Sequence, residues 1–367
     1  MKEGESALQH QPGAMGIAVG LLLALMNTGC HSRLVESLLG HGGGPARYDE
    51  ETFASKPVPT FSIPAPAGPR DAPPTTVIGR MRQYRVRDGD TLLDIARYHD
   101  LGYNEIVQAN PGVDPWQPPV GAKILVPTEW ILPCCKVDGL IVNIPEMRLY
   151  FYRRDPEHAD TILVRTHPVG LGRMDWRTPR GTFKVLGKTV NPRWYIPESI
   201  RRERIREFGD TRRSIPGGQL DNPLGKYRLE LTIAKYAIHG TNLPWGIGRQ
   251  VSHGCVQLYP EDINRLFPLV KIGTSVEFTY QSVKVGNRDG GVYVEAHPDI
   301  YGYGLPTHQA ILAGLDRHGL SGSGNPDSIS ATLDEPRGIA VRFSDSLGER
   351  RSTRQSPDSY RGWRPVQ

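Results

Sequence analysis

Cysteine is scarce in this chain, with four in 367 residues, which excludes a small fold held together by disulfides. A long hydrophobic run is also missing, because the apolar segment at residues 14–26 is too short to span a bilayer as a helix. The formal charge of +5 is spread along the chain without a long basic run, so no nucleic-acid partner is predicted. Loose attraction to anionic cell-wall polymers and an ordinary solvated surface both remain open.

The apolar segment at 14–26 has the length of a signal-peptide core and is followed by Asn27-Thr28-Gly29-Cys30. Small residues before Cys30 are similar to a bacterial lipoprotein cleavage box, in which the cysteine carries the lipid. Asn27 stands where such boxes usually have leucine, so a lipoprotein signal and a plain secretory signal both stay open. Either signal, over residues 1–30, predicts export to the periplasm or cell envelope, and lipidation of Cys30 would anchor the chain to the outer membrane.

Two segments outside the predicted domains have the composition of linkers or tails. Residues 31–81 are rich in Pro, Gly, Ala and Thr without hydrophobic periodicity, which predicts a semi-extended linker. Residues 304–367 are predicted to be a largely disordered tail, with one short helix over 306–315.

Residues 82–128 have the pattern of a compact strand–helix–helix–strand unit. Asp88-Gly89 marks a turn after the first strand, and Asp90 is the expected N-cap of the first helix. A second short helix is predicted over 104–109 and a returning strand over 122–127. This predicts a small βααβ domain.

This unit resembles the LysM module. The residues that carry the resemblance are Val86, Gly89-Asp90-Thr91-Leu92, Ile95-Ala96, Ile106, Asn110-Pro111 and Ile124-Leu125-Val126-Pro127. The resemblance implies binding to the N-acetylglucosamine backbone of peptidoglycan, in a groove between two loops. Candidate glycan contacts are Gly89, Asp90, Thr91, Asn110 and Pro111. A packing domain without a ligand is the alternative.

From Gly139 the pattern changes to short strands. They are predicted at 140–144, 148–152, 161–169, 182–186, 227–233, 237–238 and 273–280, with helices at 197–208 and 260–267. We therefore expect a mainly β domain over 138–281, a β-sandwich or partly closed barrel with a small helix beside loops on one rim. Two further strands predict a β extension over 282–303.

The candidate reactive side chains lie between Ile238 and Leu258. His239 ends a predicted strand, and Ser252-His253-Gly254-Cys255 follows a glycine-rich loop. A cysteine thiol is only a few per cent ionised at neutral pH, so acyl chemistry at Cys255 needs a base, and His239 is the candidate. The backbone N–H groups of Gly254 and Cys255 could stabilise an oxyanion.

The sequence also allows other roles for the cysteines. A lone cysteine such as Cys255 is more often a small buried apolar residue than a nucleophile. A zinc site of His239, His253 and Cys255 lacks the short paired spacing of zinc ligands, and no metal is expected. The adjacent Cys134-Cys135 could be reduced, joined to each other, or paired with another chain.

Several collinear motifs resemble the L,D-transpeptidase catalytic domain of the YkuD type. They are 141–152, 168–172, 178–182, 221–226, 238–241 and 252–255. The resemblance implies acyl transfer on peptidoglycan stem peptides without a cofactor. Cys255 would attack the carbonyl before a terminal D-alanine, and His239 would accept the thiol proton and return it to the leaving amine. The thioester would then pass to an amine of another stem peptide, to an envelope lipoprotein, or to water.

The resemblance also implies roles for residues around this pair. The carbonyl of Gly240 is the candidate for holding the His239 tautomer. His253 is either an orienting or a catalytic residue, and Ser252 is expected to form local hydrogen bonds. Tentative substrate contacts are Asn242, Arg249 and Gln257, the last standing where the family often has arginine.

The sequence leaves two rival functions open. One is a cell-wall cysteine endopeptidase or carboxypeptidase, and endopeptidases of that class place the cysteine before the histidine, the reverse of His239 and Cys255. The other is a wall-anchoring protein in which only the LysM module acts.

Overall fold

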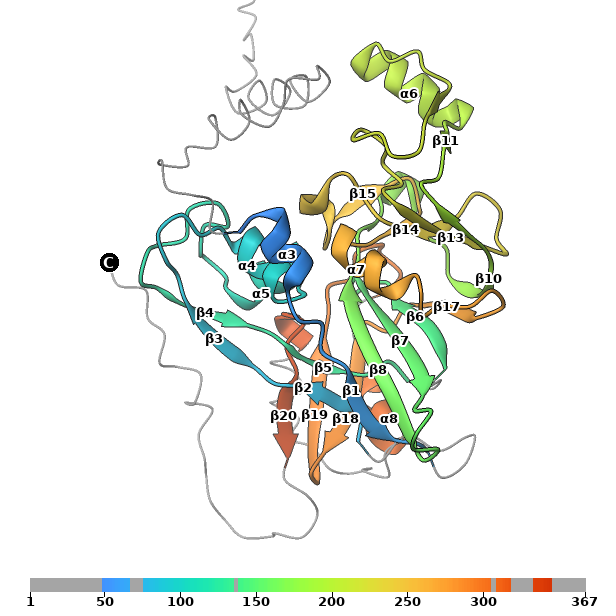
Figure 1. The fold of residues 1–367 in the computed structure, drawn as a ribbon. Coiled ribbons are helices and arrows are strands. Elements are labelled where there is room, and N and C mark those ends of the chain that lie inside the picture. Colours follow the sequence, from blue (N-terminus) through green and yellow to red (C-terminus); the bar gives the residue numbers. More distant parts are fainter. Residues whose placement is uncertain (1–47, 67–74, 135–137, 305–307, 318–332, 345–367) are drawn as a thin grey trace, which may run out of the picture.

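The computed structural model describes residues 48–66, 75–134, 138–304, 308–317 and 333–344 (Figure 1). The predicted signal peptide, Cys30 and most of the predicted tail lie outside these residues. Among the described helices, none combines the length and apolar character needed to cross a membrane.

A nine-stranded mixed sheet forms the main sheet of the molecule. Its strands, in spatial order, are β1 (Phe61–Pro64), β8 (Thr161–Pro168), β7 (Arg148–Arg154), β6 (Gly139–Asn143), β17 (Ser275–Thr279), β10 (Gly181–Val190), β13 (Tyr227–Leu231), β14 (Ala237–His239) and β16 (Val256–Gln257). The neighbours β6–β17 and β14–β16 are parallel, and the other pairs are antiparallel. This confirms the predicted mainly β architecture.

Both faces of β6 are covered, because alternate side chains of a strand point to opposite faces. Leu140 and Val142 join one hydrophobic core, which includes Ile263 and Leu266 of helix α7 (Pro260–Leu266). Ile141 belongs instead to the core that contains the LysM-like unit. The two units therefore pack on opposite faces of one sheet.

The LysM-like unit has the predicted order β3 (Arg82–Arg85), α4 (Leu92–Tyr98), α5 (Tyr103–Ala109) and β4 (Lys123–Val126). One detail differs from the prediction: the N-cap of α4 is Thr91, whose hydroxyl accepts from the N–H of Asp94 at 3.1 Å. Asp90 is buried and accepts from the Arg87 N–H at 2.7 Å instead. The turn thus uses both polar residues for its own hydrogen bonds.

The prediction of a semi-extended linker without regular structure over residues 31–81 is wrong where helix and strand are described within it. Helix α3 (Glu50–Ser55), strand β1 and strand β2 (Val77–Gly79) lie within it. Strand β1 pairs with β8 and buries Ile63, and β2 pairs with β5 (Glu129–Ile131). The alternation that buries Ile63 spans only four residues, too short to stand out among the surrounding prolines.

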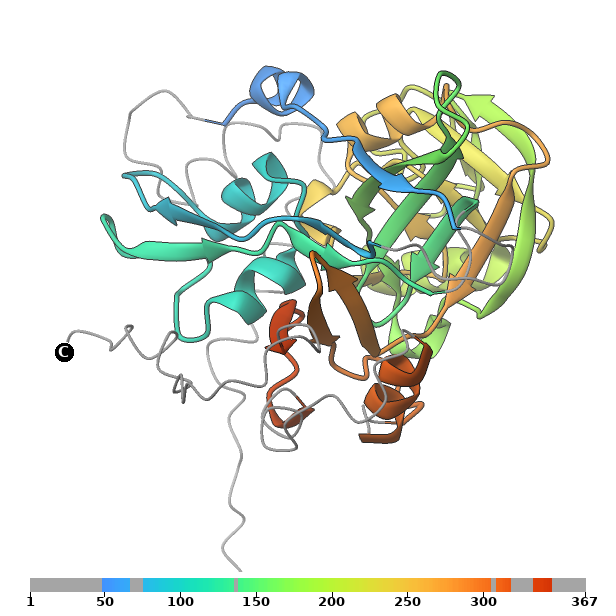
Figure 2. The same ribbon diagram turned by 90° about the horizontal axis from the view of Figure 1, so that it is seen from below.

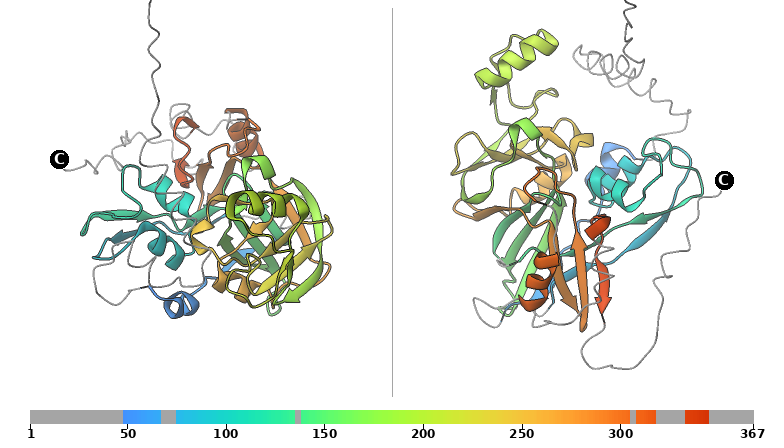
Figure 3. Two further views of the ribbon diagram at one scale, coloured as in Figure 1. Left: turned by 90° about the horizontal axis from the view of Figure 1, so that it is seen from above. Right: turned by 180° about the vertical axis from the view of Figure 1, so that it is seen from behind.

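The predicted C-terminal extension is present as the hairpin β18 (Val283–Arg288) and β19 (Gly291–Ala296). The predicted helix within the tail is α8 (His308–Arg317). Strand β20 (Val341–Ser344) pairs with β19, so the prediction of disorder is wrong there. Figures 2 and 3 show this C-terminal sheet between the LysM-like unit and the main sheet.

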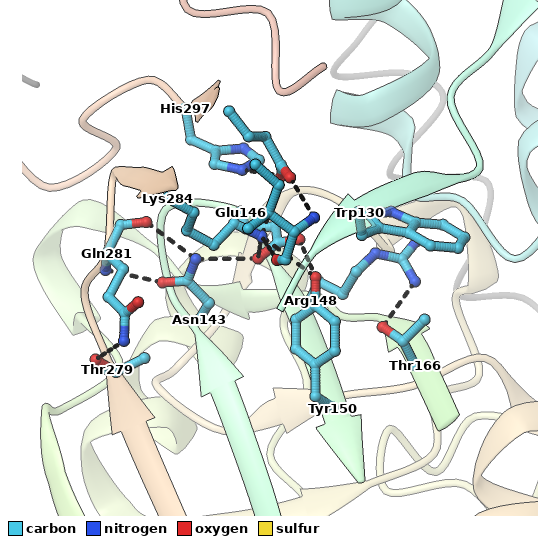
Figure 4. Close-up of polar contacts among 12 residues, drawn as sticks. Trp130, Asn143, Glu146, Arg148, Tyr150, Thr166, Thr279, Gln281, Lys284 and His297 are labelled. Carbon is cyan, nitrogen blue, oxygen red and sulfur yellow. Dashed lines mark hydrogen bonds and ion pairs between the residues drawn. The ribbon is translucent and has the colours of Figure 1, made fainter. Parts of the chain in front are cut away.

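A buried charge cluster joins the hairpin to the main sheet (Figure 4). The Lys284 ammonium lies 2.8 Å from Glu146 and 3.1 Å from Glu295, and both carboxylates are fully buried. Lys284 also donates to the Ile131 carbonyl at 2.6 Å, and His297 lies 2.6 Å from Glu295. The cluster therefore connects β18, β19, β5 and the turn after β6.

Near this cluster, the Cys134 N–H donates to the Gln281 side-chain carbonyl at 3.1 Å, and the Gln281 amide donates back to the Cys134 carbonyl at 2.8 Å. Cys134 is disulfide-bonded, which removes the reduced alternative for this residue. Cys135 lies outside the described residues.

Candidate active site

His239 lies at the end of β14, between β13 and β16, with its side chain buried (Figure 1). Its Nδ1 lies 2.6 Å from the carbonyl oxygen of Gly240, and a carbonyl can only accept, so Nδ1 carries the proton. The other ring nitrogen, Nε2, is then left with a free lone pair. This is the tautomer that a base needs, and the Gly240 contact expected from the motif is present.

The imidazole of His239 is held neutral. Burial lowers its pKa from the ordinary 6.5 to about 4; repulsion from Arg228 adds to the effect, while the Gly240 carbonyl opposes it. An unfolded chain binds a proton at this residue below about pH 6.5, so folding stability is lost as pH falls from 6.5 toward 4.

If His239 is the base of an acyl transfer, as the resemblance implies, we expect the acid limb of kcat/KM to lie near pH 4 rather than near 6.5, since the imidazole stays neutral down to its own pKa. The measurement is initial rate against pH, with enzyme returned to neutral pH to exclude inactivation. An acid limb near 6.5 would show that the buried tautomer is not the working base.

Cys255 immediately precedes β16. Because Ile238 pairs with Val256 in parallel register, Cys255 lies beside Ala237, and Ala237 and His239 face the same side of β14. The thiol is partly exposed and donates to the Lys235 carbonyl at 3.7 Å; within the described chain it forms no hydrogen bond to His239. His239 therefore ends one strand and Cys255 immediately precedes the neighbouring one.

The Cys255 thiol is protonated at rest. Burial raises its pKa above the ordinary value, while the Ala237 N–H and the positive charge of Arg228 oppose that rise. A nucleophilic role therefore requires a base. Nε2 of His239, on the neighbouring strand, has the free lone pair that can accept the thiol proton.

The turn between Ser252 and Cys255 has a defined geometry. The Ser252 hydroxyl donates to the Cys255 carbonyl at 2.6 Å and accepts from the Gly254 N–H at 3.1 Å, as expected for a local hydrogen-bonding role. Gly254 has φ +104°, and a Cβ there would lie 2.6 Å from the Tyr236 ring, so glycine is required. The Gly254 N–H donates to Ser252, so of the two predicted oxyanion donors the Cys255 N–H is the one that Ser252 does not engage.

His253 points toward helix α6 (Glu198–Phe208), which projects from the main sheet (Figure 3). Its Nε2 lies 2.8 Å from Glu203, and its ring packs edge-on against Trp176. Glu203 also accepts from Arg173 at 2.7 Å, and first Arg173, then His253, lowers the Glu203 pKa to about 2. These contacts favour an orienting role for His253. Sequence reasoning missed Glu203, because helix α6 is rich in charged residues and no sequence pattern distinguishes this carboxylate from the other charged side chains.

A cavity of about 520 Å³ separates α6 from the 173–176 turn. Its lining is charged, and consists of Arg173, Asp175, Trp176, Ser199, Arg202, Glu203, Arg206 and Glu207. Because His253 contacts both Trp176 and Glu203, this cavity adjoins the turn at residues 252–255, the cysteine turn.

The three tentative substrate contacts lie in different surroundings. The Arg249 guanidinium stacks 3.6 Å over the Tyr103 ring of α5, so it contacts the LysM-like unit. Gln257 lies opposite His239 in the β14–β16 ladder, and its backbone pairs with Gly170. Asn242 is half-buried, and its side-chain oxygen has no hydrogen-bond partner among the described residues. Only Gln257 is thus placed beside the His239 strand by its pairing.

Apart from Thr91, which caps helix α4, the predicted glycan contacts divide into two groups. The Asn110 amide donates to the carbonyls of Ile106 and Leu125 and accepts from the Leu125 N–H, and Asp90 is used by its own turn. Gly89 and Pro111 are exposed. The polar side chains at positions 90 and 110 therefore stabilise the unit, and the exposed backbone beside them remains available to a ligand.

Clusters of metal-ligand type occur elsewhere in the described chain, and neither includes His239, His253 or Cys255. One is Asp100, His167 and Asp262, and the other is Glu146, Glu295 and His297. In each a lysine ammonium approaches the carboxylates: Lys56 lies 2.6 Å from Asp100 in the first, and Lys284 lies in the second. The ammonium groups supply the positive charge that a cation would bring, so these clusters do not fit a metal.

Comparisons with known proteins give the family. Residues 138–278 match the family model for the L,D-transpeptidase catalytic domain, YkuD, and residues 84–127 match the LysM domain. The probable L,D-transpeptidase YbiS of Escherichia coli strain K12 is 34% identical over 283 residues, which cover 73% of this chain and 89% of YbiS. The probable L,D-transpeptidase YcfS of the same strain is 34% identical over 254 residues, 67% of this chain and 77% of YcfS. The chain belongs to the L,D-transpeptidase family and carries an N-terminal LysM domain.

Proposed function

We propose that this L,D-transpeptidase transfers acyl groups between peptidoglycan peptides through a thioester on Cys255, with His239 as general base. The observation that supports the proposal is the parallel pairing of β14 with β16, because His239 ends β14 and Cys255 immediately precedes β16. The Gly240 carbonyl supports the assignment by holding the proton on Nδ1 of His239. No cofactor enters the reaction.

In the first half-reaction, His239 Nε2 accepts the thiol proton and the Cys255 sulfur attacks the donor carbonyl carbon. That carbonyl belongs to the L-centre of a diamino acid, joined to a terminal D-alanine. The Cys255 N–H stabilises the resulting oxyanion. The intermediate collapses with cleavage of the C–N bond, and His239 returns the proton to the D-alanine amine.

In the second half-reaction an acceptor amine attacks the thioester carbonyl, loses its proton to His239, and releases the Cys255 thiol. An amine of a neighbouring stem peptide gives a cross-link, a side-chain amine of an envelope lipoprotein gives protein attachment, and water gives trimming. Mass spectrometry of muropeptides from cells with and without the protein separates these acceptors.

The LysM domain supports an envelope location. We propose that it binds the glycan backbone through the exposed segments at Gly89 and Pro111, and that the chain is exported. Its helix α5 is held to the catalytic domain, because the Tyr103 N–H donates to the Ile247 carbonyl at 3.0 Å and Glu105 pairs with Arg148 at 2.8 Å. A bound glycan would therefore be held at a fixed position relative to Cys255.

The direct test is trapping of the acyl-enzyme. Protein incubated with a tetrapeptide ending in D-alanine is expected to release D-alanine and to gain the mass of the remaining tripeptide acyl group on Cys255. Peptide mapping after acid quench locates the adduct. Cleavage at another bond would support the endopeptidase alternative, and neither cleavage nor adduct would support a wall-anchoring protein.

A further inference from the structure

Tyr301 lies outside the residues that match the catalytic domain, 138–278, yet its side chain is completely buried against the catalytic loops. Its hydroxyl donates to the Gly172 carbonyl at 2.7 Å and accepts from the Thr178 N–H at 3.1 Å. Both hydrogen-bonding capacities of the phenol are thus used on two backbone positions that flank the 173–177 turn.

Thr178 carries the connection from Tyr301 to the cysteine turn. Its side chain is fully buried, and its hydroxyl donates to the Gly254 carbonyl at 3.0 Å while accepting from the Gly172 N–H at 3.0 Å. Packing here is close, because a Cβ on Gly172 would come within 2.8 Å of the Gly254 Cα. Two hydroxyls therefore join the segments at 172, 178 and 254.

The position of the Gly254 carbonyl determines the direction of a neighbouring donor. The C=O of Gly254 and the N–H of Cys255 belong to one planar trans peptide, so they point in opposite directions. When Thr178 holds the carbonyl on one side, the Cys255 N–H is turned to the other. That N–H is the donor left for an oxyanion, since Ser252 engages the Gly254 N–H.

The chain before Tyr301 is anchored to the same site. The Tyr301 N–H donates to the Tyr280 hydroxyl at 3.0 Å, at the end of β17. The Gln250 amide donates to the Ile300 carbonyl at 3.1 Å, and Gln250 begins strand β15 (Gln250–Ser252), which leads to the cysteine turn. The C-terminal extension is therefore attached both to the end of β17 and to the strand that leads into the 252–255 turn.

We propose that Tyr301 is a positioning residue of the active site, which acts through Thr178 to orient the Cys255 N–H toward the oxyanion. The inference rests on the proposed acyl transfer to Cys255, and it assigns a catalytic contribution to the C-terminal extension.

The test uses Tyr301→Phe in the full chain, which keeps the ring in the core and removes both hydrogen bonds. Loss of one oxyanion donor costs about 10²–10³ in kcat, so misorientation of that donor is expected to lower kcat for D-alanine release by about 10- to 100-fold. KM should stay within about twofold. Thr178→Val should reproduce the loss, and Thr178→Ser, which keeps the hydroxyl, should restore most of the rate.

A second reaction separates orientation from general damage. Alkylation of Cys255 by iodoacetamide forms no oxyanion, so its rate should change less than about twofold in Tyr301→Phe. A parallel fall in alkylation and acyl transfer would overturn the inference, because it would show that the whole turn has moved. Tyr303→Phe, at an exposed tyrosine two residues away, is the matched control and should resemble wild type.

Three further outcomes of these experiments also test the role of Tyr301. Wild-type rates in Tyr301→Phe would overturn the inference while leaving acyl transfer intact. If wild type releases no D-alanine, the proposed function fails, and acylation of Cys255 by p-nitrophenyl acetate, which also forms an oxyanion, tests Tyr301 independently. If Tyr301→Phe does not fold, the comparison of Thr178→Val with Thr178→Ser decides, and equal rates for those two would overturn the inference.

Discussion

Replacing Cys255 with alanine is expected to abolish D-alanine release from a tetrapeptide donor, with a loss of roughly four orders of magnitude or more. The reason is that no thioester can form once the sulfur is gone. Only the backbone N–H at position 255 and substrate binding then remain to assist attack by water. The measurement is D-alanine in an enzyme-coupled assay, followed to long times at high enzyme concentration. The acyl adduct should disappear with the activity.

Two controls separate lost chemistry from a lost fold. The side chain at 255 is partly exposed, and its hydrogen bond is a weak contact to the Lys235 carbonyl, so Cys255→Ala should unfold at nearly the wild-type denaturant concentration. Binding of the variant to peptidoglycan sacculi should also be unchanged, because the LysM domain is untouched. Residual release above about one per cent of wild type would refute Cys255 as nucleophile.

Much of this site could be predicted from local sequence pattern. The short apolar strand before His239, the proline and acidic first turn of α7, and the βααβ order of the LysM domain are all local features. The resemblance implies that the Gly240 carbonyl, the next residue in the chain, holds the imidazole of His239, and the 2.6 Å contact is present. Neighbouring residues carry that information, so a single sequence suffices.

Other parts depend on residues distant in sequence and could not be predicted in the same way. Tyr301 reaches Gly172 across 129 positions, and Thr178 reaches Gly254 across 76. Lys284 pairs with a glutamate of the 143–148 turn, and Lys56 with residues of both domains. A buried lysine looks like a surface lysine in sequence, because only the fold supplies its partners. For the same reason α3 and β1 were assigned to a linker.

The second large effect concerns Lys284. Lys284→Met is expected to lower the free energy of unfolding by about 3–5 kcal/mol, because it leaves two buried carboxylates without their ammonium partner. Although burial opposes ionisation, Lys284 and then His297 lower the pKa of Glu295 to about 2 in the native protein. Urea unfolding at neutral pH, followed by tryptophan fluorescence, measures the change. Lys271→Met, at an exposed lysine shortly before β17, should change it by less than about 0.5 kcal/mol.

The stability deficit of Lys284→Met is expected to depend on pH. In wild type the depressed pKa of Glu295 contributes stability above about pH 4.5, which is lost as pH falls toward 2. Without Lys284 the carboxylates bind protons more readily, so the deficit of Lys284→Met should shrink as pH falls. A deficit that is constant with pH would indicate lost packing rather than an unpaired charge, and one below 1 kcal/mol would refute the prediction. Because this hairpin leads into Tyr301, the variant should also lose acyl transfer before it loses the LysM fold.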